Sequence, residues 1–244
     1  MEAESWNSKR AHSMSEPATA RPTVSAHYDA AYFEWQKDGG QFGGWANIDK
    51  FRKSIEPASR VLDLGCGGGF LLANLECAER FAIEPNATAR ETAVSNGVRA
   101  FANAAEALAA IGQESIDVVI SDNALEHALE PWQELRALKP LLKPGGKLHI
   151  VVPCENISWV YKTKDINQHV YSWSPQSIGN LLKAAGYEVE YSRPYIHKWP
   201  PRMSRQLARL GRPVFNFCCR VWGQLDRRWF QIEAMATKPM SDHD

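Results

Sequence analysis

Cysteine is scarce in this sequence of 244 residues, and no two cysteines have the C-x-x-C spacing of a metal or redox motif. An odd number of cysteines without that spacing argues against a disulfide framework and against a structural zinc site. We therefore expect the protein in a reducing cytoplasm. The five cysteines are Cys66, Cys77, Cys154, Cys218 and Cys219.

Long apolar runs and net charge are absent as well. No stretch approaches the roughly 18 continuous apolar residues of a membrane span. The 28 basic residues equal the 28 acidic ones, so nothing suggests broad attraction to nucleic acid. Residues 1–24 lack the apolar core of a signal peptide and are rich in Ser, Ala, Glu and Pro, which predicts a flexible tail. Residues 25–240 are predicted to form a single domain.

The most informative stretch that is present runs from Val61 to Gly69, with the sequence VLDLGCGGG. Its apolar residues predict a short strand of the kind that is buried on both faces in a parallel sheet. The glycines allow a tight turn and close approach of a ligand to the backbone. A helix is predicted from Phe70, so its free N–H groups and positive end face the same place.

A dinucleotide-binding loop is the main alternative for this stretch. It needs the pattern G-x-G-x-x-G, but the third glycine position falls on Phe70 or on Leu72, depending on the register. The carboxylate of Asp63 would also repel a pyrophosphate, whereas it would attract an ammonium group. Both observations disfavour an NAD-dependent dehydrogenase.

The pattern hydrophobic-Asp-Leu-Gly-Cys-Gly-Gly-Gly resembles the first motif of class I S-adenosylmethionine-dependent methyltransferases, particularly the type 11/12/23 domains and the quinone-pathway O-methyltransferases. The resemblance implies S-adenosylmethionine as cofactor, with S-adenosylhomocysteine as product. It also implies an α/β fold: a Rossmann-like, doubly wound, mostly parallel seven-stranded sheet with helices on both faces and the last strand antiparallel. The implied cofactor residues are Asp63, Gly65, Cys66, Gly67, Glu84, Pro85, Asn103, Ala104, Ser121 and Asn123.

Three later segments match further parts of this family pattern. Glu84 ends a second predicted strand about 20 residues after the first, where an acid holds ribose hydroxyls. The Asn103 side chain and the backbone N–H of Ala104 are expected to hydrogen-bond with the edge of the adenine ring. The segment 122–127, which follows a strand predicted over 116–121, resembles the family's "LEH" segment and is expected to line the methionine side of the pocket.

Alternating strand and helix signals extend this fold toward the end of the chain. A helix is predicted from Pro131 to Leu142, followed by a strand over 147–153. Ser174 and Pro175 predict the start of another helix, and Gly186 predicts its end. Strands over 187–191 and 231–238 complete the sheet.

Two histidines are candidates for the catalytic base. A hydroxyl acceptor must lose a proton as it takes the methyl group, and histidine is suited to accept it near neutral pH. His169 lies in a polar and aromatic loop, and in the resembling quinone-pathway enzymes a histidine also occurs just before the corresponding helix. His127 is the second candidate, and its alternative role is to tie its turn to the cofactor loop.

Some quinone-pathway relatives bind a divalent metal through acidic residues in the segment that matches 122–127. This chain has Asn123 where those relatives carry an acid, so that ligand set is incomplete. Acidic side chains at a helix start commonly act as caps. We therefore predict no metal, with Asp122, Glu126 and His127 as the remaining candidate ligands.

Two further segments are expected near the acceptor. Residues 25–56 form a predicted cap, whose aromatic residues are expected to act as a lid and whose glycine pairs are expected to make a mobile loop. Residues 196–228 form a basic and aromatic insertion. It is expected either to cover the sheet edge as an amphipathic helix pair or to dock an acidic or lipid-linked substrate, with peripheral membrane contact.

The function predicted from the sequence is methyl transfer from S-adenosylmethionine to a small-molecule or glycan acceptor, at a hydroxyl oxygen. Methylation at nitrogen or carbon is the enzymatic alternative. A protein that binds the cofactor without turnover is the other, since it would keep Asp63, the glycines and Glu84 but would not need His169.

Overall fold

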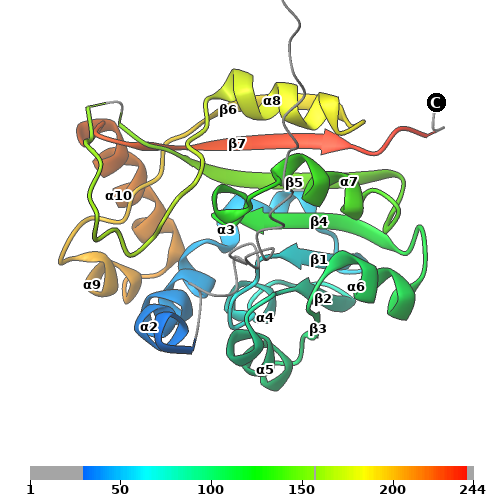
Figure 1. Cartoon of the computed structure of the whole chain (residues 1–244). Coiled ribbons are helices and arrows are strands. Elements are labelled where there is room, and N and C mark those ends of the chain that lie inside the picture. Colours follow the sequence, from blue (N-terminus) through cyan, green and yellow to red (C-terminus); the bar gives the residue numbers. More distant parts are fainter. Residues whose placement is uncertain (1–29, 157, 241–244) are drawn as a thin grey trace, which may run out of the picture.

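The computed structural model describes residues 30–156 and 158–240 and contains one seven-stranded sheet in the order β3-β2-β1-β4-β5-β7-β6 (Figure 1). β7 pairs antiparallel with both of its neighbours, and the remaining pairs are parallel. The predicted sheet with an antiparallel last strand is therefore confirmed. The strands are β1 (Arg60–Leu64), β2 (Glu79–Ile83), β3 (Arg99–Phe101), β4 (Ile116–Asp122), β5 (Leu142–Cys154), β6 (Glu188–Tyr195) and β7 (Phe230–Thr237).

Helices cover both faces of the sheet. One apolar cluster joins the sheet to α6, α7 and α8, and a second joins it to α3, α4 and α5. Because both faces are buried, the central strands read as nearly continuous apolar runs. The helices are α2 (Ala30–Ala46), α3 (Ile48–Phe51), α4 (Phe70–Ala73), α5 (Ala87–Ser95), α6 (Ala104–Ile111), α7 (Pro131–Leu138), α8 (Pro175–Ala184), α9 (Ser204–Ala208) and α10 (Arg212–Leu225), with 3₁₀ turns η1 (Arg52–Ser54) and η2 (Leu125–His127).

The boundaries of α8 follow the predicted capping signals. The Ser174 hydroxyl accepts a hydrogen bond from the backbone N–H of Ser177, and Pro175 occupies the first helical position. Beyond the end of the helix, Gly186 has a φ of 88°, a left-handed conformation that glycine adopts without steric cost.

The helix predicted from Pro131 to Leu142 is four residues shorter than expected and ends at Leu138. Pro140 has no N–H group to continue the helical hydrogen bonds, so the chain leaves the helix there. Leu142 then begins β5 by pairing with Ile116 of β4. The prediction was wrong because the apolar spacing of the leucines continues past the proline that stops the helix.

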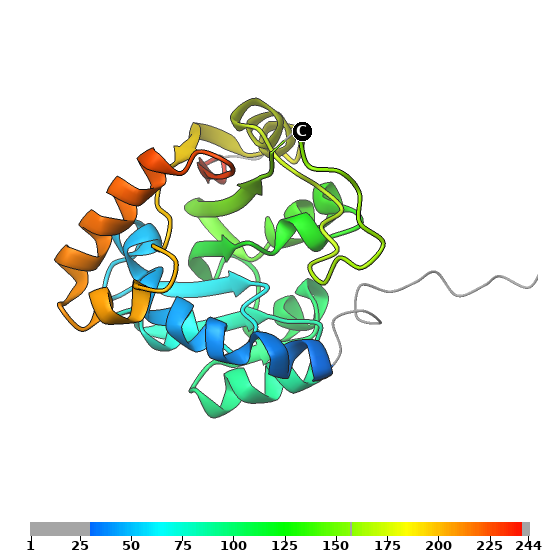
Figure 2. The same cartoon turned by 90° about the vertical axis from the view of Figure 1, so that its left-hand side faces the viewer.

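At the carboxyl ends of the parallel strands lie α2, α9 and α10 (Figure 1), and Figure 2 shows α9 and α10 beside α2. Their aromatic residues meet in a small cluster of described residues that contains no residue of the sheet. The predicted helix pair in the insertion is therefore present, but it packs on α2 rather than over the sheet edge. The cluster includes Phe42, Trp45, Trp199 and Phe215.

The predicted flexible tail over 1–24 and residues 25–29 of the predicted cap lie outside the described residues. Within the described part of the chain, none of the helices combines the length and the apolar character needed to cross a bilayer.

The glycine pairs of the predicted cap do not form a mobile loop. All four glycines lie inside α2, a helix of 17 residues. Their use is close packing: a Cβ atom at Gly44 would lie 2.5 Å from the carbonyl oxygen of Phe70, and one at Gly43 would lie 3.3 Å from the Trp199 ring. The missing side chains let α2 approach α4 and the insertion, and this contact offsets the low helix propensity of glycine.

This packing predicts opposite effects for two alanine substitutions in α2. Gly44→Ala should destabilise the protein by about 1–3 kcal/mol, because its Cβ would meet backbone that cannot move aside. Gly39→Ala is the matched control, since its Cβ would have no neighbour within 4 Å, and it should gain up to about 1 kcal/mol in helix propensity. Urea unfolding of both variants tests this, and equal stabilities would contradict it.

Candidate active site

A cavity of about 590 Å³ opens at the carboxyl ends of β1, β2 and β4, with α2 on its other side. This is where open α/β sheets bind their ligands, and the volume is within the range of small-molecule sites. Nearly all of the predicted cofactor residues meet here. Its walls include Asp63, Gly65, Cys66, Gly67, Glu84, Pro85, Asn103, Asn123 and His127.

Backbone conformation explains two of the glycines after β1. Gly65 has a φ of 76°, and a Cβ there would lie 2.3 Å from the Cβ of Ala124. Gly67 has a φ of 52°, and its N–H donates a 2.8 Å hydrogen bond to the carboxylate of Glu84. The glycine loop is therefore tied to the end of β2, and the cavity floor is a single hydrogen-bonded unit.

Glu84 is held by main-chain donors on both oxygens. Oε2 accepts from Gly67 and Oε1 accepts from the N–H of Asn86, at 2.8 and 2.9 Å. Each carboxylate oxygen has two acceptor positions, so one remains on each for a ligand hydroxyl. Burial raises the pKa of Glu84, and the two backbone N–H groups oppose that rise. A fixed acceptor of this kind suits a pair of ribose hydroxyls.

Asp63 is the most strongly perturbed acid of the cavity. Its side chain is buried, and within the described structure its Oδ1 atom has no hydrogen-bond partner. Burial raises its pKa well above the ordinary value, and the neighbouring carboxylates of Asp122 and Glu84 raise it further. A buried carboxyl group that lacks a partner on Oδ1 and lies close to two other carboxylates would be stabilised by a cationic ligand group.

Asp122 and Asn123 are already engaged. The Asp122 carboxylate accepts from Lys50 Nζ and from Asn47 Nδ2, both at 2.8 Å, so it joins the end of β4 to the segment around α3. Asn123 accepts from Gln231 through its Oδ1 atom and donates to Asp122. Both side chains are therefore engaged within the protein, and with Asn123 in place of an acid the magnesium set implied by the family resemblance is incomplete.

Three predicted cofactor residues have other contacts in this structure. Asn103 lies on the cavity wall, but its amide caps α6 by accepting from the N–H of Glu106. Ala104 is buried at the start of α6 and does not line the cavity. Ser121 is also behind the wall, where its hydroxyl donates to the carbonyl of Leu64 and ties β4 to β1. Their roles toward the cofactor stay predictions.

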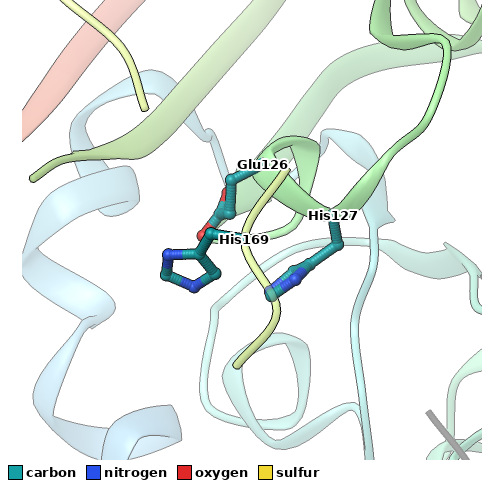
Figure 3. Close-up of side chains that lie close together, drawn as sticks. All are labelled: Glu126, His127 and His169. Atoms are coloured by element: carbon teal, nitrogen blue, oxygen red, sulfur yellow. The ribbon is translucent and has the colours of Figure 1, made fainter. Parts of the chain in front are cut away.

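Both predicted catalytic histidines lie in one cluster beside the cavity. Figure 3 shows their imidazoles together with the carboxyl group of Glu126, and the ring centroids of His127 and His169 are 4.9 Å apart. His127 ends η2 and lines the cavity, whereas His169 stands behind it in the loop before α8. The N–H groups of Val170 and Tyr171 donate to the carbonyl of Glu126, and these main-chain bonds place His169.

Glu126 is the buried member of the cluster. Neither of its carboxyl oxygens has a hydrogen-bond partner among the described residues. Burial raises its pKa to about 8, with a further contribution from Asp122, so the group is mostly protonated at neutral pH. Glu126, His127 and His169 offer ligand atoms within 4.8 Å of one another. One carboxylate and two imidazoles are donors that suit transition metals better than Mg²⁺.

The structure adds one residue that was not predicted from the sequence. Glu155, just after β5, lies with its Oε1 atom 2.6 Å from the Nδ1 atom of His169. A carboxylate on one ring nitrogen selects the tautomer and leaves the other nitrogen to act as an acceptor. The only signal in the sequence was an acid directly after a strand, which is too common to identify it.

Comparison with known proteins agrees with this geometry. Residues 39–192 match the profile of a methyltransferase domain. A ubiquinone biosynthesis O-methyltransferase of Ruegeria pomeroyi is 33% identical over 211 residues, covering 70% of this chain and 84% of the relative. One of the same name from Roseobacter denitrificans is 29% identical over 187 residues, covering 65% and 74%.

Solved structures agree on the fold. A methyltransferase of Thermotoga maritima, described as a possible histamine N-methyltransferase, superposes with a TM-score of 0.60 at 16% identity and covers 88% of this chain and all of its own. Phosphoethanolamine N-methyltransferase 2 of Haemonchus contortus, solved with S-adenosylmethionine, has a TM-score of 0.60 at 15% identity, covering 90% and 61%. With the matched domain, the sheet and the acid-lined glycine loop, this chain belongs to the class I S-adenosylmethionine-dependent methyltransferases.

Proposed function

We propose that this methyltransferase acts on a hydroxyl oxygen of a small-molecule acceptor. The observation that carries the proposal is the imidazole of His127 on the cavity wall, with the ring of His169 beside it and the carboxylate of Glu155 on the far side of that ring. The O-methyltransferases named above support oxygen as the methylated atom. A glycan acceptor and methylation at nitrogen or carbon stay predictions without a supporting observation.

The cofactor end and the acceptor end of the cavity have different chemistry. We propose that Asp63 holds the ammonium group of S-adenosylmethionine and that Glu84 holds its ribose. Methyl transfer is an in-line displacement in which the acceptor oxygen attacks the methyl carbon and the carbon–sulfur bond breaks, releasing a neutral thioether. Because the leaving group is good, the protein mainly positions the two reactants.

The proton of the acceptor hydroxyl needs a base. We propose that His127, on the cavity wall, accepts this proton and passes a proton on to the imidazole of His169 beside it, with Glu155 as the residue that positions His169. General-base catalysis of this kind contributes about 10²–10⁴-fold to a rate. No step of this mechanism passes through a metal ion.

Screening of hydroxylated acceptors tests the proposed reaction. Phenols, quinols, sugars and nucleotide sugars are to be compared with matched amines in an assay that follows the release of homocysteine from the product. We expect turnover only with hydroxylated compounds. Turnover restricted to amines would overturn the assignment to oxygen.

Replacing the histidines should slow methyl transfer and leave cofactor binding unchanged. We expect His169→Ala and His127→Ala to lower kcat by about 10²–10⁴-fold, because the base or the imidazole that takes its proton is lost. Calorimetry with S-adenosylhomocysteine is the control and should show an unchanged Kd; a wild-type rate in the His169 variant would remove it from the mechanism.

Asp63 should make cofactor binding depend on pH. Since its pKa is raised in the empty site by burial and by two neighbouring carboxylates, a bound ammonium group must first displace its proton. Affinity for S-adenosylmethionine should therefore increase as pH increases toward that raised pKa and level off above it. Asp63→Asn should lose about 1.5–3 kcal/mol of binding and show no such increase. Calorimetry across pH measures both, and identical pH profiles for the two proteins would contradict the assignment.

Magnesium should have no effect on the reaction. The oxygens of Asp122 and Asn123 are occupied by Lys50, Asn47 and Gln231, so an all-oxygen site cannot assemble without breaking these contacts. After chelation and dialysis, we expect the same rate with and without added Mg²⁺. Activity that returns only on Mg²⁺ addition would show that the site rearranges to bind it.

A further inference from the structure

The insertion carries an apolar stripe on its solvent side. Val214, Phe217, Val221 and Leu225 of α10 are between 40% and 74% exposed. Their spacing of three, four and four residues places them within an arc of about 80° on one side of the helix. Leu210, just before the helix, and Met203, just before α9, are exposed as well.

This stripe is not the packing face of α10. The opposite side of the helix carries Phe215, Cys219 and Gly223, which are buried, and Phe215 packs on Phe42 and Trp45 of α2. The helix is therefore apolar on two sides, and only one of them is covered. A contiguous exposed apolar surface of this kind marks an interaction site.

Basic residues surround the stripe, and acids are nearly absent. Segment 196–228 contains seven arginines and Asp226 as its only acid. The carboxylate of Asp226 is already paired with Lys198 and Arg228. The exposed arginines of the segment are Arg202, Arg205, Arg209, Arg220, Arg227 and Arg228.

The charges decide between a lipid surface and a second copy of the chain. A two-fold dimer through the stripe would bring the same arginines of both copies together, with no unpaired acid in the segment to neutralise them. An anionic bilayer surface instead offers phosphate groups to the arginines and acyl chains to the stripe. We propose that segment 196–228 is a peripheral docking surface for anionic lipid bilayers.

This surface adjoins the cavity. Trp199, from the same segment, lines the cavity and contacts α2 at Gly43 and Phe42. Docking would hold the mouth of the cavity near the lipid surface. The inference does not depend on the proposed O-methylation, because lipid binding is measured without cofactor or acceptor.

Vesicle flotation of the full chain tests the proposal. The probes are vesicles of phosphatidylcholine alone and of phosphatidylcholine mixed with phosphatidylglycerol. We expect binding to the anionic vesicles only, weakened by added salt. The variants Phe217→Ser with Leu225→Ser, and Arg209→Gln with Arg220→Gln, should each weaken binding about tenfold or more.

Matched control variants test whether the effect is specific to this surface or follows from losing any exposed apolar or charged side chain. Val94→Ser alters an apolar residue on α5 that is also more than half exposed, and Arg136→Gln with Lys183→Gln removes two exposed charges on α7 and α8. Both should bind like wild type. The proposal is overturned if wild type does not float with anionic vesicles or if the α10 variants bind as well as the controls. A wild-type dimer that the α10 variants dissociate, seen by sedimentation without vesicles, would also overturn it.

Discussion

Three carboxyl groups lie around the cavity at the ends of β1, β2 and β4, and the surrounding structure differs in how it compensates each of them. Lys50 pairs with Asp122 and Asn47 donates a hydrogen bond to it, which attaches the segment around α3 to the end of β4. Main-chain N–H groups from the glycine loop and from the start of α5 hold Glu84. Asp63 has no such compensation on its Oδ1 atom. In the proposed complex, the ammonium group of the cofactor would supply the missing partner of Asp63.

Close backbone approach is the second condition for this cavity. α2 reaches the glycine loop because its glycines present no side chains to α4, and the insertion reaches α2 through the same surface. The aromatic residues at that contact then fill the space that the glycines leave. The cavity and the insertion are consequently connected through one helix, α2.

Most of the fold could be predicted because the signals for it are local. The apolar strands, the Ser174 cap and the turn at Gly186 each depend on a few neighbouring residues, and their order predicts the sheet. α2 could not be predicted, since pairs of glycines favour a loop. They are helical here because Gly44 packs closely on Phe70 and Gly43 on Trp199, and both of these residues are distant in the sequence. The leucine spacing did not predict the end of α7, because it continues past Pro140, where the helix cannot.

The candidate site divides in the same way. The family motif located Asp63, Glu84 and the glycines, because each stands at a fixed distance from a strand end. A contact between loops was not visible in the sequence, since Glu155 is 14 residues from His169. The capping role of Asn103 did have a local signal, an acid three residues later at Glu106. Ser121 precedes Asp122, which lines the cavity. Because side chains alternate along β4, the side chain of Ser121 points away from the cavity.

The loop that carries His169 is fastened by main-chain hydrogen bonds from Val170 and Tyr171 to the carbonyl of Glu126. Bonds of that kind are indifferent to side-chain identity. The position of the loop relative to η2 is therefore set by the main chain, and the side chains of Val170 and Tyr171 can vary without loosening this attachment.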